Sequence, residues 1–292
     1  MSDVQARRLA AGSEGRAGNE TGTGPSGIAE RELERKLEKS EQTESPGGRT
    51  VVGRGRLGGS IRRALESRGL DVTGVGRGFD PESLVGEVVL ICVPDDEIVA
   101  VVERIGASGV RPRLVGHTSG ATGLDVLGPI RSEDGVFSLH PLQTVPDDET
   151  DLRGAPAAVA GSDDRATEAA RDLAGSLGMV PFEVGEEMRA LYHAAASIAS
   201  NFLITLEQEA AVMLERAGVE EPRRVLTPLV RRSLENWIER GPDALTGPVA
   251  RGDRETVESH RLAIGLHAPE LLDLYDALVS RTESLARGKV SG

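Results

Sequence analysis

The sequence predicts an α/β fold with a doubly wound sheet, followed by an all-helical region, on three observations. Between residues 49 and 185, short apolar runs alternate with amphipathic stretches, as in parallel sheets that helices cover on both faces. A glycine-rich turn follows the first apolar run. Beyond Gly185 no strand pattern returns, and apolar residues recur at spacings of three and four, which is typical of amphipathic helices.

The order of these elements divides the chain into three parts. The predicted strands cover residues 50–53, 71–75, 88–94, 113–118, 136–141, 155–161 and 180–185. The predicted helices cover residues 57–69, 95–107, 164–178, 186–218, 222–241, 253–265 and 268–288. Residues 1–48 are rich in Gly, Ser, Glu and Thr, so we expect a disordered tail there, with a partner-binding tail as the alternative. After this tail we predict a sheet domain at residues 49–185 and a helical domain at residues 186–292.

The composition limits the classes of function. The formal net charge of -13 argues against a nucleic-acid partner, and the 2% of aromatic residues argues against base stacking. The single Cys92 excludes a disulfide framework and a multi-cysteine metal site, and we expect no metal. The sequence has no apolar run of the roughly 18–20 residues that span a bilayer and no apolar signal-peptide core. We therefore expect a cytoplasmic protein without a membrane partner.

The glycine-rich turn, TVVGRGRLGGSI at residues 50–61, has the spacing G-x-G-x-x-G in Gly53, Gly55 and Gly58. In the first β-α turn of a doubly wound domain, these glycines allow a tight turn, close approach of a pyrophosphate and close packing of helix on sheet. We therefore predict a dinucleotide-binding, Rossmann-type domain rather than an incidental basic turn. The predicted cofactor contacts in the turn also include Arg54, Arg56 and Leu57.

The end of the second predicted strand distinguishes the two nicotinamide dinucleotides. An NAD enzyme usually carries Asp or Glu there, about 20 residues beyond the turn, to bind the ribose hydroxyls. Here Arg77 lies nineteen residues after Gly58, and the next carboxylate is Asp80. Because a guanidinium suits a 2′-phosphate, we predict NADP(H) as the cofactor. A solvated surface arginine is the alternative.

Polar residues follow three of the later predicted strands, at the edge where ligands bind in doubly wound folds. Val93 and Pro94 end one strand and are predicted to border the nicotinamide. Ser119 follows the next strand, close to His117, for which we favour a structural role. His140 ends the third strand and is a candidate acid or base, because histidine titrates near neutral pH.

A polar stripe lies on the first helix of the predicted helical domain. His193, Ser197 and Asn201 are spaced four apart within ALYHAAASIASNFL, so they share one face of the helix. Such a stripe needs polar partners, which a substrate or a neighbouring helix would provide. We therefore add His193 and Asn201 to the candidate catalytic residues, with ordinary helix–helix hydrogen bonding as the alternative.

These motifs resemble a family of bacterial Rossmann-like proteins with a C-terminal helical domain of unknown function, described as NADP oxidoreductases. The motifs are VVGRGRLGGSI, VVLICVPDDEI, GHTSGATGLDVL, SLHPLQTV, YHAAASIASNFL and GPVARGDRETVESH, and they extend from about residue 49 to the C-terminus. The family is more distantly similar to pyrroline-5-carboxylate reductase, ketopantoate reductase, 3-hydroxyisobutyrate dehydrogenase and prephenate dehydrogenase. The resemblance implies a helical domain like that of 6-phosphogluconate dehydrogenase, which commonly dimerises.

The resemblance also bears on the chemistry. Prephenate dehydrogenases have a His-Pro pair at the end of a late strand, which points to His140 as an acid or base. Hydroxyisobutyrate- and ketopantoate-type enzymes carry a Lys and, one turn later, an Asn; here Asn201 fits the Asn, but Ser197 stands at the Lys position. His193 or His140 would have to replace that lysine. Without it, a simple hydroxyacid dehydrogenase mechanism is in doubt.

The leading hypothesis is an NADPH-dependent reductase of a small carbonyl or imine substrate, for instance a keto acid such as ketopantoate. His140 and His193 are the candidates for the proton, with Ser119 and Asn201 orienting the substrate. The alternative is a non-catalytic NADP(H)-binding sensor or scaffold. We expect a homodimer formed through the helical domain.

Overall fold

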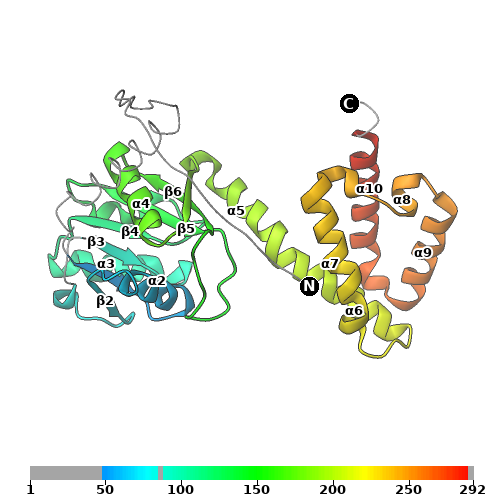
Figure 1. Ribbon diagram of the computed structural model, residues 1–292, viewed down its shortest axis with the longest axis horizontal. Coiled ribbons are helices and arrows are strands. Elements are labelled where there is room, and N and C mark those ends of the chain that lie inside the picture. The colour runs from blue at the N-terminus through cyan, green and yellow to red at the C-terminus, as the bar shows by residue number, and fades with distance from the viewer. Residues whose placement is uncertain (1–47, 85–87, 289–292) are drawn as a thin grey trace, which may run out of the picture. The chain divides into compact units, whose positions relative to one another are not determined.

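The computed structural model describes residues 48–84 and 88–288. Its first part is a seven-stranded sheet with the order β2-β1-β3-β4-β5-β6-β7 (Figure 1). Each predicted strand is present, within three residues of its predicted bounds. The strands are β1 (Arg49–Val52), β2 (Val72–Val75), β3 (Val88–Ile91), β4 (Leu114–His117), β5 (Val136–Pro141), β6 (Pro156–Gly161) and β7 (Val180–Glu183). The predicted tail at 1–48 lies outside the described residues except for its last residue.

The strand directions differ from the prediction at one place. Strands β1 to β5 are parallel neighbours, whereas β6 runs antiparallel to β5 and β7 runs parallel to β6. The doubly wound fold is confirmed, whereas the parallel direction that the sequence pattern indicates does not hold at β6. The reason lies in the connection: residues 142–155 contain no helix, and a parallel neighbour needs a crossover that is usually helical.

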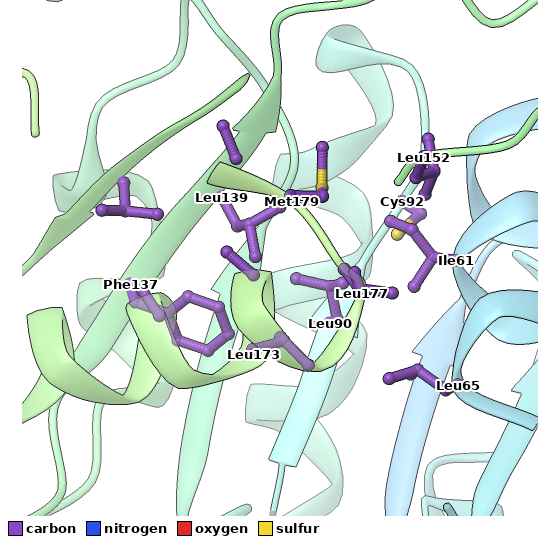
Figure 2. Close-up of a cluster of buried hydrophobic side chains, with 14 of the residues drawn as sticks. Ile61, Leu65, Leu90, Cys92, Phe137, Leu139, Leu152, Leu173, Leu177 and Met179 are labelled. Atoms are coloured by element: carbon purple, nitrogen blue, oxygen red, sulfur yellow. The ribbon is translucent and has the colours of Figure 1, made fainter. Parts of the chain in front are cut away.

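Helices cover both faces of the sheet, as predicted for a doubly wound fold. On one face, α2 (Arg56–Glu66) and α4 (Asp164–Ser176) pack on a buried apolar cluster that includes Phe137 and Leu139 (Figure 2). On the other face, α3 (Ile98–Ser108) and the 3-10 helix at Leu124–Ile130 pack on a second cluster. The neighbours Val51 and Val52 point to opposite clusters, as the period of two in a strand requires.

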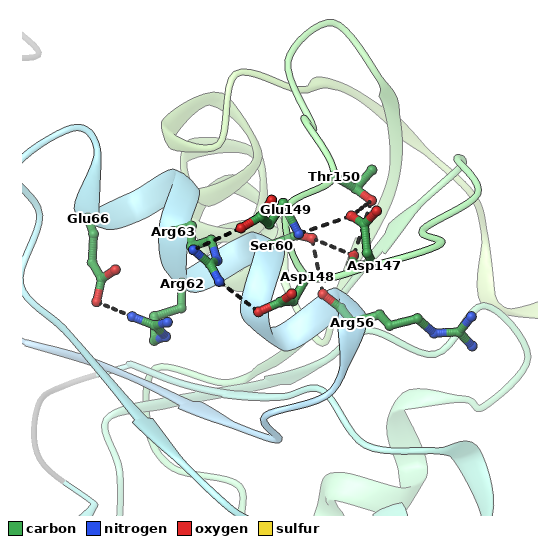
Figure 3. A network of polar contacts seen from close by, with 9 residues as sticks. All are labelled: Arg56, Ser60, Arg62, Arg63, Glu66, Asp147, Asp148, Glu149 and Thr150. Atoms are coloured by element: carbon green, nitrogen blue, oxygen red, sulfur yellow. Dashed lines mark hydrogen bonds and ion pairs between the residues drawn. The ribbon is translucent and has the colours of Figure 1, made fainter.

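The loop after β5 holds α2 in place (Figure 3). The Ser60 hydroxyl donates to the carbonyl oxygen of Asp147 at 3.2 Å, and Arg63 pairs with Asp148 at 2.9 Å. Gly59 permits this contact, because a Cβ there would lie 2.5 Å from the Cβ of Asp148. The loop between β5 and β6 thus holds the helix that follows the glycine turn, although about 85 residues separate them in sequence.

The C-terminal part is helical, as predicted. The predicted helix at 186–218 is interrupted by a π-helical segment, Ile198–Phe202, between α5 (Arg189–Ser197) and α6 (Leu203–Arg216). The remaining helices are α7 (Pro222–Arg240), α8 (Pro248–Arg251), α9 (Arg254–His267) and α10 (Leu272–Gly288). Across residues 48–84 and 88–288, no helix is long and apolar enough to cross a bilayer.

Many large apolar side chains of the C-terminal helices are exposed. Leu229, Trp237 and Ile238 on α7 are 65%, 61% and 69% exposed, and Ile204 on α6 is 66% exposed. The buried apolar cluster of this part is small and is built on Ile264, Ala268 and Leu271. An exposed apolar surface of this extent commonly marks an interaction site.

Candidate active site at the carboxyl edge of the sheet

The glycine turn follows β1, the strand that pairs with β2 on one side and β3 on the other. Gly53 has a φ of +121°, and a Cβ there would lie 2.2 Å from the carbonyl oxygen of Cys92. A Cβ on Gly58 would lie 2.2 Å from the carbonyl oxygen of Gly53. A Cβ on Gly55 would meet no atom of the described residues within 4 Å. Gly53 and Gly58 are therefore needed by the fold itself, whereas Gly55 leaves open space above the turn.

The start of α2 fits a phosphate group. Gly55 is its N-cap residue and offers no side-chain cap, and the first turn of the helix has no acidic residue. The free N–H groups and the positive end of the helix dipole favour an anion at such a terminus. With the open space at Gly55, the turn matches the requirements of a dinucleotide pyrophosphate.

The other residues predicted for the turn have different environments. Arg54 donates to the carbonyl oxygen of Gly74 at 3.0 Å, which ties the turn to β2. Leu57 packs against the apolar cluster under α2, so its side chain faces the core. Arg56 is exposed at the first position of α2. Of these three side chains, that of Arg56 is best placed to meet an anion.

Arg77 lies at the predicted position, directly beyond the end of β2, and is exposed. Its guanidinium pairs with the carboxylate of Glu97 in the short 3-10 helix Asp95–Glu97 that follows β3. Val93 is buried and Pro94 is exposed between β3 and this helix. Arg77 was predicted from the sequence, whereas its partner Glu97 was not.

Three aromatic side chains meet at the end of β5. The Tyr192 hydroxyl and His140 Nδ1 are 2.7 Å apart, and the ring centroids of His140 and His193 are 5.8 Å apart. Both imidazoles lie against Gly120: a Cβ there would be 2.6 Å from His193 Nδ1 and 2.9 Å from His140 Nε2. The structure therefore brings the two predicted histidines together and adds Tyr192 and Gly120 to them.

A buried arginine holds the start of α5 against the sheet. Arg189 donates to Ser138 Oγ on β5 at 2.7 Å and to Glu186 Oε1 at 3.0 Å. Glu186 in turn accepts a hydrogen bond from the Leu124 backbone N–H at 3.0 Å. Because Tyr192 and His193 follow within one turn of α5, this network sets where they meet His140.

Burial keeps the imidazoles of His140 and His117 neutral. Burial first, and then the neighbouring His193, lowers the pKa of His140 to about 4. Burial and the nearby Arg189 lower the pKa of His117 to about 4; His117 is fully buried, and its structural role stays a prediction. Burial raises the pKa of the Tyr192 hydroxyl to about 12. At neutral pH, both of these imidazoles and the phenol are uncharged.

Two residues that were predicted to orient a substrate, Ser119 and Asn201, are placed less favourably for that role. The Ser119 hydroxyl accepts from the N–H of Thr122 at 2.9 Å and donates to its side chain, so it stabilises its own turn. Asn201 is exposed in the π-helical segment, about 12 Å along the helix from His193 at 1.5 Å per residue. The described residues contain no group of His, Cys, Asp or Glu that could hold a metal ion.

Comparisons with known proteins agree with this architecture. Residues 80–141 match the Rossmann-like domain family, and residues 155–282 match the family called Domain of unknown function (DUF2520). The second match includes the last two strands as well as the helices. These matches confirm the resemblance to Rossmann-like proteins with a C-terminal domain of unknown function. No curated protein matches the sequence.

Solved structures of similar fold include two bacterial proteins. A candidate NADP oxidoreductase from Bacteroides fragilis has a TM-score of 0.69 at 19% identity, and a protein from Thermotoga maritima has 0.68 at 23%. Each comparison covers 82% of this chain and 99% of the other. A pyrroline carboxylate reductase from Plasmodium falciparum, solved with NADP bound, has 0.53 at 12% and covers 83% and 99%. At these identities the likeness establishes the fold.

The lowered pKa of His140 predicts a loss of stability in mild acid. Because the pKa is about 4 in the folded chain and about 6.5 when unfolded, the unfolded state binds the proton first as the pH falls. The contribution of His140 is complete above pH 6.5 and is lost between pH 6.5 and 4. In urea unfolding from pH 8 to 4, we expect a smaller loss in His140→Gln than in the wild type. A His140 titration midpoint at 6.5 by NMR would contradict this.

Proposed function

We propose that this protein is an NADP(H)-dependent oxidoreductase that reduces a small carbonyl or imine substrate. The observation that carries the proposal is the placement of the glycine turn and the histidine pair at one edge of one sheet. The turn ends β1, where the strand order reverses, and His140 ends β5, three strand positions or roughly 14 Å away. A dinucleotide with its phosphates on the turn would extend along this edge toward the histidines.

The proposal assigns roles to most of the predicted site residues. Gly53, Gly55 and Gly58 would hold the pyrophosphate, and Arg77 would leave Glu97 to bind the 2′-phosphate. Val93 and Pro94 would border the nicotinamide, which supplies the hydride when bound. His140 and His193 would serve the substrate oxygen or nitrogen, and Ser119 would keep the Gly120 turn in shape. Asn201 would orient a substrate only if a second chain or a rearrangement brings it near.

The proposal includes a homodimer formed through the helical part. Its support is the exposed apolar surface of α6 and α7, with Ile204, Leu229, Trp237 and Ile238 all more than 60% exposed. A second copy of the chain would remove this surface from water at roughly 25 cal/mol per Å² of apolar area. Arrangements of this kind are common among homodimers.

Nucleotide binding tests the cofactor. We expect NADPH to raise the melting temperature and NADH to do so much less, because only NADPH carries the phosphate for Arg77. In Arg77→Ser, binding of NADPH should weaken by roughly tenfold or more, as for a lost hydrogen bond between charged groups, with NADH unchanged. In Gly58→Ala, binding of both should be lost, because the added Cβ meets the Gly53 carbonyl. Thermal unfolding measures the change in melting temperature, and calorimetric titration measures nucleotide binding in the two variants.

The control for Gly58→Ala is Gly175→Ala in α4, where a Cβ meets nothing within 4 Å among the described residues. This variant should bind like the wild type. Equal stabilisation of the wild type by NADPH and NADH would overturn the assignment of Arg77. Unchanged binding in Gly58→Ala would overturn the assignment of the turn.

Turnover tests whether the site is catalytic. We expect oxidation of NADPH with a member of a panel of keto acids, ketopantoate included, and cyclic imines. His140→Ala and His193→Ala should each lower kcat by roughly 10²-fold or more, as for removal of a positioned acid–base group. Tight NADPH binding without turnover of any substrate would instead favour a cofactor sensor.

Sedimentation equilibrium tests the dimer. We expect the wild-type chain to be dimeric and Trp237→Glu with Ile238→Glu to be monomeric, because two carboxylates would be buried in an apolar contact. Val99→Glu on α3, where the side chain is also exposed, is the matched control and should stay dimeric. A monomeric wild type, or a dimeric double variant, would contradict the proposal.

A further inference from the structure

The Tyr192 hydroxyl forms a hydrogen bond with the ring of His140. The hydroxyl oxygen lies 2.7 Å from Nδ1, and the two rings meet edge to face with centroids 5.6 Å apart. Phe182 on β7 contacts Tyr192 from another side, with centroids 6.0 Å apart. The phenol is therefore held by packing as well as by the hydrogen bond.

The chemistry of the two groups fixes the direction of this hydrogen bond. The Tyr192 hydroxyl is protonated, because burial raises its pKa to about 12, and within the described residues it has no other hydrogen-bond partner. If Nδ1 carried the proton, it would donate to the phenol oxygen, and the phenolic O–H would have no acceptor among the described residues. When the O–H donates to Nδ1, the phenol and Nδ1 are both satisfied, and the imidazole proton lies on Nε2, which has no acceptor among the described residues.

The surroundings of His140 keep this imidazole neutral. The charged and titratable groups that act on it are Tyr192, His193 and Arg189 from α5, His117 from β4 and Asp95 after β3. Burial opposes a protonated ring most strongly, the neighbouring His193 and Arg189 also oppose it, and the charge of Asp95 favours it; the balance lowers the pKa of His140. Nε2 makes no hydrogen bond to the described residues and lies against Gly120 at the edge of the site.

We propose that Tyr192 is a positioning residue that holds His140 as the neutral Nε2–H tautomer, so that the site offers a hydrogen-bond donor and selects a carbonyl oxygen over a protonated imine. A carbonyl oxygen has a lone pair that accepts from Nε2–H, and the hydrogen bond polarises the carbonyl. A protonated imine has no lone pair on nitrogen. This inference rests on the proposed function, since it assumes that substrate meets His140.

The tautomer can be observed without turnover. In long-range nitrogen–proton NMR spectra of the full chain labelled with nitrogen-15 histidine, we expect His140 to show an unprotonated Nδ1 and a protonated Nε2 at pH 7. In Tyr192→Phe, both tautomers should appear, and the His140 titration midpoint should rise from about 4, because the donor to the neutral ring is lost. His140→Gln assigns the signals.

The chain provides a matched control. Tyr275 also contacts a histidine, with its hydroxyl 2.9 Å from His260 Nδ1. Tyr275→Phe removes the same kind of hydroxyl and should leave the His140 signals unchanged. A protonated Nδ1 on His140 in the wild type, or His140 signals that do not change in Tyr192→Phe, would overturn the proposal.

The substrate preference is tested with the panel. We expect wild-type kcat/KM to be higher for keto acids than for cyclic imines, and Tyr192→Phe to lower it by roughly tenfold or more for keto acids alone, as for a weakened oxyanion donor. Faster turnover of imines would overturn the preference. Absence of any turnover would overturn the proposed function and with it the substrate preference, whereas the NMR result would still decide the role of Tyr192 toward His140.

Discussion

The sheet domain depends on one constraint, the close packing of the glycine turn after β1 against the end of β3. The missing side chains of Gly53 and Gly58 let β1, α2 and the Cys92 carbonyl approach to distances that a Cβ would prevent. This approach allows β1 to pair in register with both β2 and β3. The strand order reverses at β1, and ligands bind at such a point in this fold. Gly53 and Gly58 therefore also place the open N-terminus of α2 at the edge of the sheet where a ligand would bind.

The histidine site depends on a second constraint, the buried charge of Arg189. Leaving a buried charge without its partners is costly, so the bonds to Ser138 and Glu186 fix the first turn of α5. Tyr192 and His193 then have little freedom in where they meet His140. Gly120 completes the site, because any side chain there would displace both imidazoles.

Most of the fold could be predicted from the sequence, because strand and helix periodicities are local properties. The reversal of β6 was not predicted, although the sequence between β5 and β6 has no helical pattern; the contacts of this loop with Ser60 and Arg63 are distant in sequence and could not be predicted. The histidines were predictable from their positions at strand and helix ends. Tyr192 was not, although both tyrosines of the chain lie beside a histidine in space. Such pairings, like that of Arg77 with Glu97, exist only once the chain has folded.

The Arg77–Glu97 pair bears on how a 2′-phosphate would be distinguished from a ribose hydroxyl. Arg77 pairs with the single charge of Glu97 at an exposed place, whereas a 2′-phosphate would bring a charge of about −1.5 to −2 and three acceptor oxygens, so a phosphate would compete with Glu97 for Arg77. A hydroxyl brings no charge and leaves the pair intact. Asp95 and Asp96 precede Glu97, so their carboxylates would oppose a phosphate bound at Arg77. A preference for the phosphate would therefore be the difference between attraction to one arginine and repulsion by the carboxylates that follow β3, which would make it smaller than the arginine alone would give.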